Sequence, residues 1–183
     1  SWQVVVGEYA KMGKEIKITT IPYEFKGFMG MRNFIIQDSE GRKLAWANSN
    51  WTHLDISTGL PARLTPADTD NYVLGEKMEM DYAPRKIKLP EDMIAQEAFT
   101  VQKHHLDTNH HVNNCQYVCM AEDFLPESFK IYQMRAEYKM QAKLGDVICP
   151  KVKTETDKVV VSLDNIEGKA YAIVEFLKKE GDI

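Results

Sequence analysis

The sequence has no long run of apolar residues, and this excludes one class of protein at once. No window approaches the roughly 18 consecutive apolar residues that a membrane-spanning helix needs, so no membrane span is predicted. The first residues, Ser1-Trp2-Gln3, do not resemble a secretory or transit peptide. We therefore expect a cytoplasmic protein, most simply a bacterial one.

Positive charge is not in excess either. The 183 residues include 23 Lys and Arg against 27 Asp and Glu, which gives a net charge of −4. The chain thus lacks the overall basic field that attracts proteins to nucleic acid. We expect no nucleic-acid partner, and an acidic protein partner would have to be held by a local basic patch.

Cysteine is scarce. The three residues are Cys115, Cys119 and Cys149, an odd number that suggests reduced thiols and not a disulfide framework. Cys115 and Cys119 are four residues apart, so on a helix they share a face. The simplest interpretation is a pair of small core residues, with a redox pair or a catalytic thiol as the alternatives.

What is present indicates two halves joined by a connector. Residues 1–82 contain runs typical of strands, such as the alternating "KEIKITTIPYEF". The turn Ser39-Glu40-Gly41 predicts a hairpin between the run that precedes it and the run that follows it. Residues 58–76 are rich in turn formers and predict a loop with at most one short helical turn. Residues 83–95 contain two prolines and basic residues, so we expect a linker there.

The second half, residues 96–183, has a different order of elements. "EAFTVQKHHL" predicts a strand, and the stretch after His111 has a helical period, with Asn113 as N-cap and Pro126 ending the helix. Four further strands follow. One helix packed on an antiparallel sheet is an α+β arrangement. The first half offers similar strands but no helix ahead of them.

The stretch "HHLDTNHHVNN", residues 104–114, holds four of the five histidines. A metal site is not favoured, because adjacent histidines on a strand face opposite sides and no cysteine lies at ligand spacing. A polar turn in which His104, His105 and His110 are merely solvated is the plain alternative.

A catalytic turn is the third interpretation. Asp107, Asn109 and His111 are spaced by two, so in an extended or irregular loop they could project the same way. The helix that follows has free backbone N–H donors at its positive end, expected from Val112, Asn113 and Asn114. Such donors suit the oxyanion that forms when a carbonyl is attacked.

The string "LDTNHHVNN" resembles the D-x-N-x-H-V-N-N motif of the acyl-acyl-carrier-protein thioesterases, the bacterial and plant enzymes that end fatty acid synthesis. "AEYKMQAKLGD" is similar to a strand and turn of the family's second domain. Eight residues fit the family's first-domain pattern: Arg32, Phe34, Asp38, Gly41, Trp51, Asp55, Pro61 and Arg63.

The resemblance implies an α+β fold of two tandem hotdog domains with antiparallel sheets. It also implies that the first hotdog begins without its first strand and central helix, so that a second copy in a homodimer could cover it. The substrate would be acyl carrier protein (ACP) carrying a fatty acyl chain, and no cofactor or metal is implied. Candidate walls of the acyl pocket are Trp46, Trp51 and Met29.

One departure concerns catalysis. The family has a glutamate in a Y-x-x-E context after the helix, where this chain has Gln141. Glutamine forms hydrogen bonds but cannot take a proton. Asp107 is then the key carboxylate, as nucleophile or as general base, with Asn109 holding it or the water and His111 protonating the leaving thiolate.

Partners and rivals follow from the same residues. The residues expected to dock acidic ACP are Arg85, Lys86, Lys88, Lys139 and Lys143. The alternatives are a hotdog acyl-CoA thioesterase, a truncated acyl-binding domain without catalysis, and a metal hydrolase.

Overall fold

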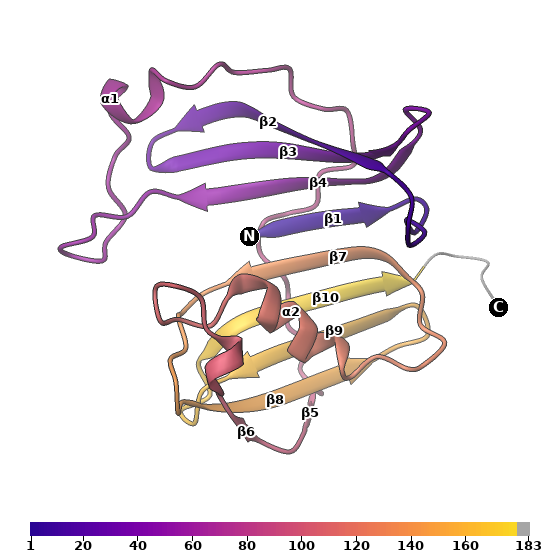
Figure 1. Cartoon of the computed structure of the whole chain (residues 1–183). Helices are drawn as coiled ribbons and strands as arrows, with labels where there is room; N and C mark the ends of the chain where they lie inside the picture. Colours follow the sequence, from indigo (N-terminus) through magenta and orange to yellow (C-terminus); the bar gives the residue numbers. More distant parts are fainter. Residues whose placement is uncertain (179–183) are drawn as a thin grey trace. The chain divides into compact units, whose positions relative to one another are not determined.

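The computed structural model describes residues 1–178 and divides them into two compact units. The division falls between Arg85 and Lys86, inside the expected linker at 83–95. The remainder of that linker belongs to the second unit, where Ile87 is buried. Each unit is built on an antiparallel sheet (Figure 1).

The first unit consists of four strands and one helical turn. The strands are β1 (Trp2–Val6), β2 (Ile16–Lys26), β3 (Met29–Asp38) and β4 (Lys43–Thr52), and the turn is α1 (Pro66–Thr69). Their order in the sheet is β2-β3-β4-β1. The expected hairpin of β3 and β4 is confirmed, and Asp38 Oδ1 stabilises its turn by accepting the N–H groups of Glu40 and Arg42.

One face of this sheet is covered by the segment that follows α1. Buried Asn33 accepts the Met78 N–H at 3.0 Å, and the Gln3 amide bonds the Asp81 carbonyl and the Ala83 N–H. These bonds satisfy polar groups that would otherwise cost free energy in the interior. The polar side chains therefore fix the path of the loop across the sheet.

The opposite face is aromatic and aliphatic. Trp2 stacks on Phe34 with ring centroids 4.9 Å apart and meets Trp51 edge-on at 6.0 Å. Register places Ile16 and Ile18 on the same face, where they are 40% and 63% exposed. We call these five residues the tryptophan face.

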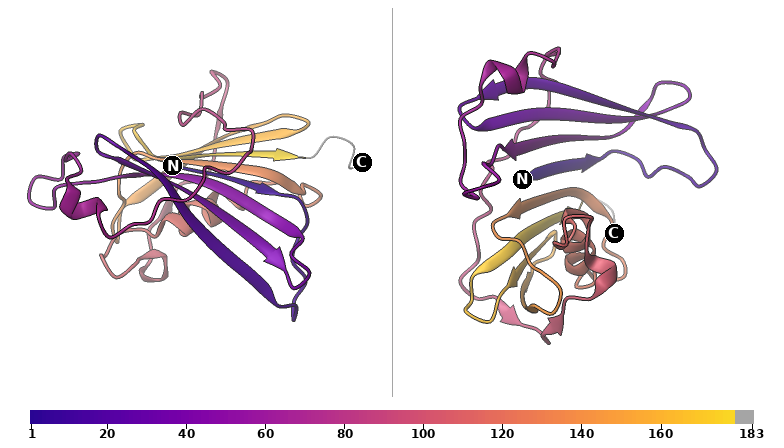
Figure 2. Two further views of the ribbon diagram at one scale, coloured as in Figure 1. Left: turned by 90° about the horizontal axis from the view of Figure 1, so that it is seen from above. Right: turned by 60° about the vertical axis from the view of Figure 1, so that its left-hand side comes forward.

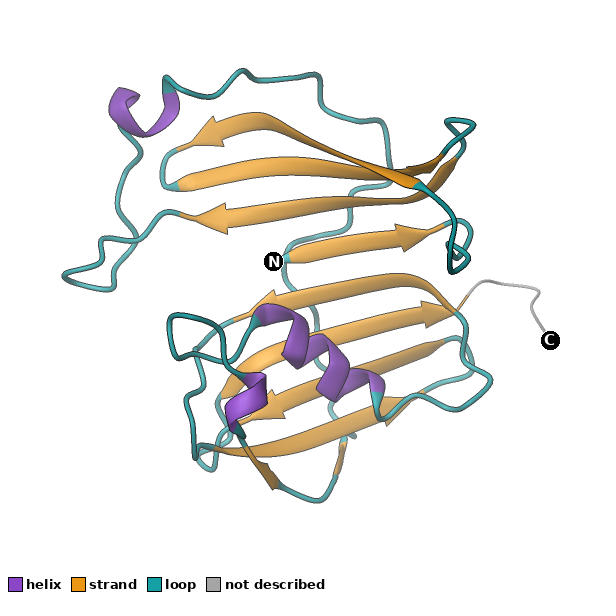
Figure 3. Cartoon of the chain, in the orientation of Figure 1, coloured by secondary structure: helices purple, strands orange, loops and turns teal. Residues whose placement is uncertain are grey.

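The second unit has a curved sheet with a helix on it (Figures 2 and 3). Its elements are β5 (Ile94–Ala95), β6 (Phe99–Thr100), the 3₁₀ turn η1 (Lys103–His105), α2 (Asn114–Glu122), β7 (Ile131–Tyr138), β8 (Val147–Thr154), β9 (Lys158–Asp164) and β10 (Ala170–Lys178). The strand order is β7-β10-β9-β8-β5, and β6 also pairs with β8.

Helix α2 packs its apolar side onto the sheet to form the main core. Tyr117, Met120 and Ala121 are buried against strand residues that include Val161 and Phe176. Complete burial of one such large side chain contributes about 1.5–3 kcal/mol. This packing holds the start of the helix, and hence the preceding turn, in a fixed place.

Three expectations about this unit were wrong. The strand predicted at 97–106 is only Phe99–Thr100, because the Gln102 N–H donates to His105 Nδ1 and closes a 3₁₀ turn instead. The helix ends at Glu122, four residues before Pro126. Cys115 and Cys119 are exposed and not part of the core, because α2 turns its other side to the sheet.

Candidate functional site

The D-x-N-x-H residues lie on a closed turn between η1 and α2. The Asp107 N–H donates to the His111 carbonyl at 2.8 Å, and Leu106 pairs with Val112 on either side. His110 has φ 60°, a left-handed conformation that is uncommon outside glycine. Of the extended and irregular loops that the sequence allowed, the structure has the irregular one, and a tight turn presents these side chains.

The turn is organised around the Asp107 carboxylate. Its Oδ1 atom accepts the N–H groups of Asn109 at 2.8 Å and His111 at 3.3 Å. Within residues 1–178, no bond is recorded for Oδ2. Asp107 is half-buried, so the carboxylate is held by one oxygen and offers the other to a water or a substrate.

The segment that contains Gln141 runs beside this turn. The Val112 N–H donates to the Ala142 carbonyl at 2.9 Å, and His111 is paired with Lys143. His111 is half-buried, whereas Asn109 and Gln141 are exposed. The structure thus brings the backbone of Gln141 close to the predicted catalytic turn, and all four side chains remain accessible.

Two tyrosines that sequence reasoning did not single out support this arrangement. Tyr117, which is 2% exposed, accepts the Ala142 N–H at its hydroxyl oxygen at 2.8 Å. The Tyr138 hydroxyl donates to the Asn114 carbonyl at 3.1 Å. Burial raises the pKa of Tyr117 to about 12 and also raises the pKa of Tyr138. The signal in the sequence was a tyrosine on the buried side of the predicted helix.

The predicted set of free backbone donors was partly wrong. The Val112 N–H is used by Ala142, and the Asn113 N–H donates to the His105 carbonyl at 2.9 Å. Asn113 is the expected N-cap, and its Oδ1 accepts the Cys115 N–H at 2.8 Å. Among the described residues of this helix start, only the Asn114 N–H is left without a recorded acceptor.

The three candidate acyl-pocket residues do not share one surface. Trp46 and Met29 are on one face of the first sheet, because Met29 pairs with Thr52, an even number of residues from Trp46. Trp51 is on the other face, where its indole N–H donates to Ser49 Oγ at 2.7 Å. A single wall made of all three is therefore excluded.

The five residues expected to dock ACP are all exposed. Arg85 ends the first unit, and Lys86 and Lys88 begin the second. Lys139 and Lys143 are two residues before and after Gln141, and Lys143 is paired with His111 of the predicted catalytic turn.

The remaining histidines do not form a metal centre. His104 and His110 are exposed, and burial followed by the nearby charge of His104 lowers the pKa of His105. Residues 1–178 contain no group of three or more His, Cys, Asp or Glu side chains suited to a metal ion. In the same range, no helix is long and apolar enough to cross a membrane.

Solved structures share this fold. An acyl-ACP thioesterase from Bacteroides thetaiotaomicron matches with a TM-score of 0.87 and 18% identity over 97% of this chain and 74% of its own. The 12:0-ACP thioesterase from Umbellularia californica gives 0.84 and 17% over 97% and 73%. A MaoC-like dehydratase from Phytophthora capsici gives 0.61 and 13% over 97% and 70%. Similarity at this level of identity shows the hotdog fold alone.

Comparison of the sequence with models of protein families identifies two domains. Residues 1–72 match the acyl-ACP thioesterase N-terminal domain, and residues 87–176 match the acyl-ACP thioesterase C-terminal domain. No curated protein matches the chain. The two models cover most of both units in the family's order, and so the chain belongs to the acyl-ACP thioesterases, enzymes that hydrolyse thioesters.

Proposed function

We propose that this chain hydrolyses the thioester of fatty acyl-ACP at the turn formed by Asp107, Asn109 and His111, and releases a free fatty acid. The observation that carries the proposal is the Asp107 carboxylate. One of its oxygens is fixed by two backbone N–H groups, and the other has no recorded partner in the described chain. A carboxylate held in this way is ready to act without reorganising.

The reaction needs a nucleophile, a stabilised oxyanion and a proton for the leaving group. Water attacks the thioester carbon while Asp107 takes its proton, or Asp107 attacks directly and water then cleaves the mixed anhydride. The C–S bond breaks, and His111 supplies the proton that converts the carrier thiolate to a thiol. Asn109 orients the water or Asp107.

The oxyanion would be met at the start of α2. The Asn114 N–H is the donor that remains there, and the helix dipole adds to its effect. One well-placed donor contributes about 3 kcal/mol to such a transition state. The Tyr138 bond to the Asn114 carbonyl fixes the peptide that follows this donor.

Gln141 assigns the proton-accepting role to Asp107. The side chain amide can orient water or bind the substrate but cannot act as a base. Lys139 and Lys143 on either side, with Arg85, Lys86 and Lys88, would attract acidic ACP by their charge. We also propose that a second copy of the chain covers the tryptophan face of the first unit.

The test is Asp107→Asn, which keeps an oxygen to accept the two N–H groups but removes the charge. We expect a loss of at least 100-fold in thiol release from acyl-ACP, because a positioned acid or base contributes about 10²–10⁴. Asp123→Asn, a change at an exposed aspartate at the end of α2, is the matched control.

The outcomes separate the candidate functions. Retained hydrolysis in Asp107→Asn would refute the proposed site. Acyl-ACP binding without any turnover by the unmodified chain would identify an acyl-binding domain. Faster turnover of acyl-CoA than of acyl-ACP would identify an acyl-CoA thioesterase. A single turnover in ¹⁸O-labelled water would place the label on Asp107 only if this residue attacks directly.

A further inference from the structure

On the face opposite α2, a segment of chain crosses the sheet of the second unit. We call residues 86–93 the strap. One end is bonded to two residues of β7. Arg135 donates to the Lys86 carbonyl, and the Ile87 N–H donates to the Glu137 carboxylate, both at 3.0 Å. At the other end, Asp92 forms an ion pair with Lys153 of β8.

The strap passes over β10 and β9 between these two anchors. With neighbouring strands about 4.8 Å apart, the distance from β7 to β8 is about 14 Å. Within the described part of the chain, residues 88–91 form no recorded hydrogen bond. The strap is therefore fixed by hydrogen bonds and the ion pair at its two ends only. Its apolar side chains face the sheet.

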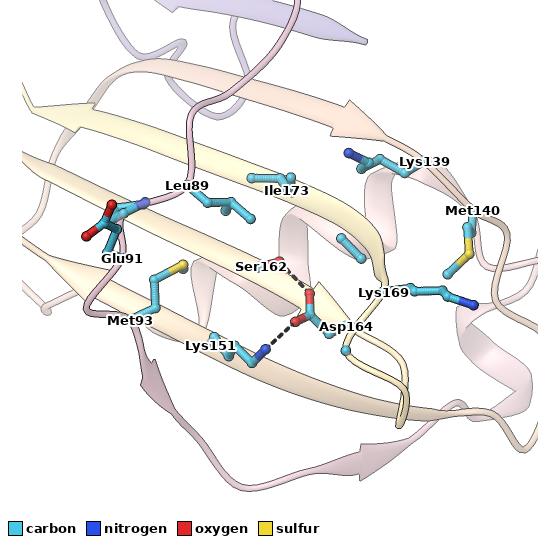
Figure 4. Close-up of a pocket in the computed structure, with 13 residues that line it drawn as sticks. Leu89, Glu91, Met93, Lys139, Met140, Lys151, Ser162, Asp164, Lys169 and Ile173 are labelled. Atoms are coloured by element: carbon cyan, nitrogen blue, oxygen red, sulfur yellow. Dashed lines mark hydrogen bonds and ion pairs between the residues drawn. The ribbon is translucent and has the colours of Figure 1, made fainter.

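A cavity of about 700 Å³ lies between the strap and the sheet. Leu89 and Met93 of the strap and Ile173 of β10 are among the residues that line it (Figure 4). Ile173 belongs to a small core with Ile87 and Val160, and Met93 packs against that core. The volume is in the range of ligand sites, about 300–1,000 Å³, and the lining combines apolar with polar and charged residues.

The charges in this cavity are unevenly distributed. Lys151 is neutralised by buried Asp164 at 2.9 Å. Figure 4 places Lys139 and Lys169 toward one end of the cavity, with their ammonium groups pointing apart, and Glu91 toward the other end. Lys169 pairs with Glu167, but both are more than 60% exposed, so solvent screens that pair. One end of the cavity is thus cationic and the far end is acidic.

We infer that this cavity is a second binding site that accepts a long-chain fatty acid anion. The alkyl chain lies between the strap and Ile173, and the carboxylate lies at the end of the cavity that carries Lys139 and Lys169. Glu91 repels a carboxylate at the far end and so sets the direction of the ligand. This site is on the face of the sheet away from α2, so it does not depend on the proposed catalytic turn.

The first measurement maps the ligand. A fatty acid with a diazirine on its alkyl chain is photolysed with the complete chain in its Asp107→Asn form, which turns over no substrate on the proposed mechanism. We expect the label on peptides containing residues 88–93 or 170–173, identified by mass spectrometry. Label confined to other peptides would overturn the proposal, whatever the outcome for hydrolysis.

The second measurement is the affinity for dodecanoate, followed by calorimetry. The Lys139→Glu/Lys169→Glu double variant should raise the Kd at least tenfold, and Leu89→Trp should raise it similarly by filling the cavity from its exposed side. Lys130→Glu/Lys14→Glu carries the same change of charge at exposed sites and should leave it unchanged.

A matched uncharged ligand completes the test. Dodecanol has the same chain without the carboxylate, so its affinity should be weaker and should not respond to the lysine substitutions. Equal binding of dodecanoate by the double variant and the control would refute the carboxylate site. Unchanged binding by Leu89→Trp would refute the position of the alkyl chain.

Discussion

At the scale of single residues, Gln141 distinguishes this chain from the pattern of its family. Its neighbour Ala142 is bonded through both backbone groups, to Val112 and to Tyr117, so the backbone beside Gln141 is held in place while the Gln141 side chain is exposed. In the proposed site, this amide takes the position that the family pattern gives to a carboxylate.

We predict that Gln141→Glu raises kcat about tenfold or more. A glutamate there adds a proton acceptor beside the turn, and a positioned base is worth about 10²–10⁴ in rate. The measurement is the rate of thiol release from acyl-ACP between pH 5 and 8. The gain in kcat should be lost toward the acidic end of this range, where the new glutamate becomes protonated. Gln96→Glu, at an exposed position, is the control. A rate that is unchanged or lower would mean that the amide itself is needed.

Two predictions about single residues were wrong: the free backbone N–H donors at the start of α2, and a shared acyl-pocket wall of Trp46, Trp51 and Met29. The motif correctly indicated an N-cap at Asn113, because that preference is local. It could not indicate that the Val112 and Asn113 N–H groups bond to Ala142 and His105, since those contacts depend on tertiary structure. The opposite facing of Trp46 and Trp51, in contrast, follows from strand periodicity and could have been predicted.

At the scale of elements, α2 positions the site through one hydroxyl. We predict that Tyr117→Phe lowers the free energy of unfolding by about 1–3 kcal/mol, because it leaves the N–H of fully buried Ala142 without its acceptor. It should also lower kcat several-fold with little change in KM, since the Gln141 segment loses its tie to the helix. Urea unfolding and steady-state kinetics measure the two effects.

The matched control for this change is Tyr132→Phe, which removes a hydroxyl from a tyrosine that is 37% exposed. It should change neither stability nor kcat. A Tyr117→Phe protein that is less stable but has the same kcat would show that the hydroxyl only supports the fold.

Buried tyrosines also predict how stability depends on pH. Burial raises the pKa of Tyr23 and Tyr117 to about 12, above the ordinary value of 10.0 for a tyrosine. Between about pH 10 and 12 the unfolded chain loses these protons while the folded chain keeps them, so the folded state is favoured less as pH rises. Urea unfolding at pH 8, 9, 10 and 11 should give a constant free energy up to pH 9 and a fall above pH 10. A constant value through pH 11 would contradict this.

The elements differed in how well sequence predicted them. The longer strands of both sheets, β1 to β4 and β7 to β10, were predicted from alternation and turn residues. The short strand β5 was not, because Ile94–Ala95 lies in the stretch that was expected to be a linker. The stretch 97–106 was not, because His105 bonds Gln102 locally and competes with strand pairing. The exposure of Cys115 and Cys119 was missed since spacing shows that they share a face but not which face meets the sheet.

At the scale of the whole molecule, the second unit buries its apolar surface around α2, whereas the first has no comparable helix among its described residues. Ile18 and Trp51 are 63% and 48% exposed on the tryptophan face. Exposed apolar side chains that share one face of a sheet are typical of surfaces that bind another protein. A self-complementary contact between two copies is the simplest closed arrangement.

We therefore predict that the chain forms a dimer through this face, with a mass twice the 21.0 kDa of one chain in light scattering after gel filtration. Ile18→Lys should convert it to the monomer, because a charge at the contact would be desolvated without a partner. Ile166→Lys, at a residue 78% exposed in the β9–β10 turn, should leave the dimer intact. A monomeric mass for the unmodified chain at tens of micromolar would refute the contact. A dimer that persists in Ile18→Lys would place it on another surface.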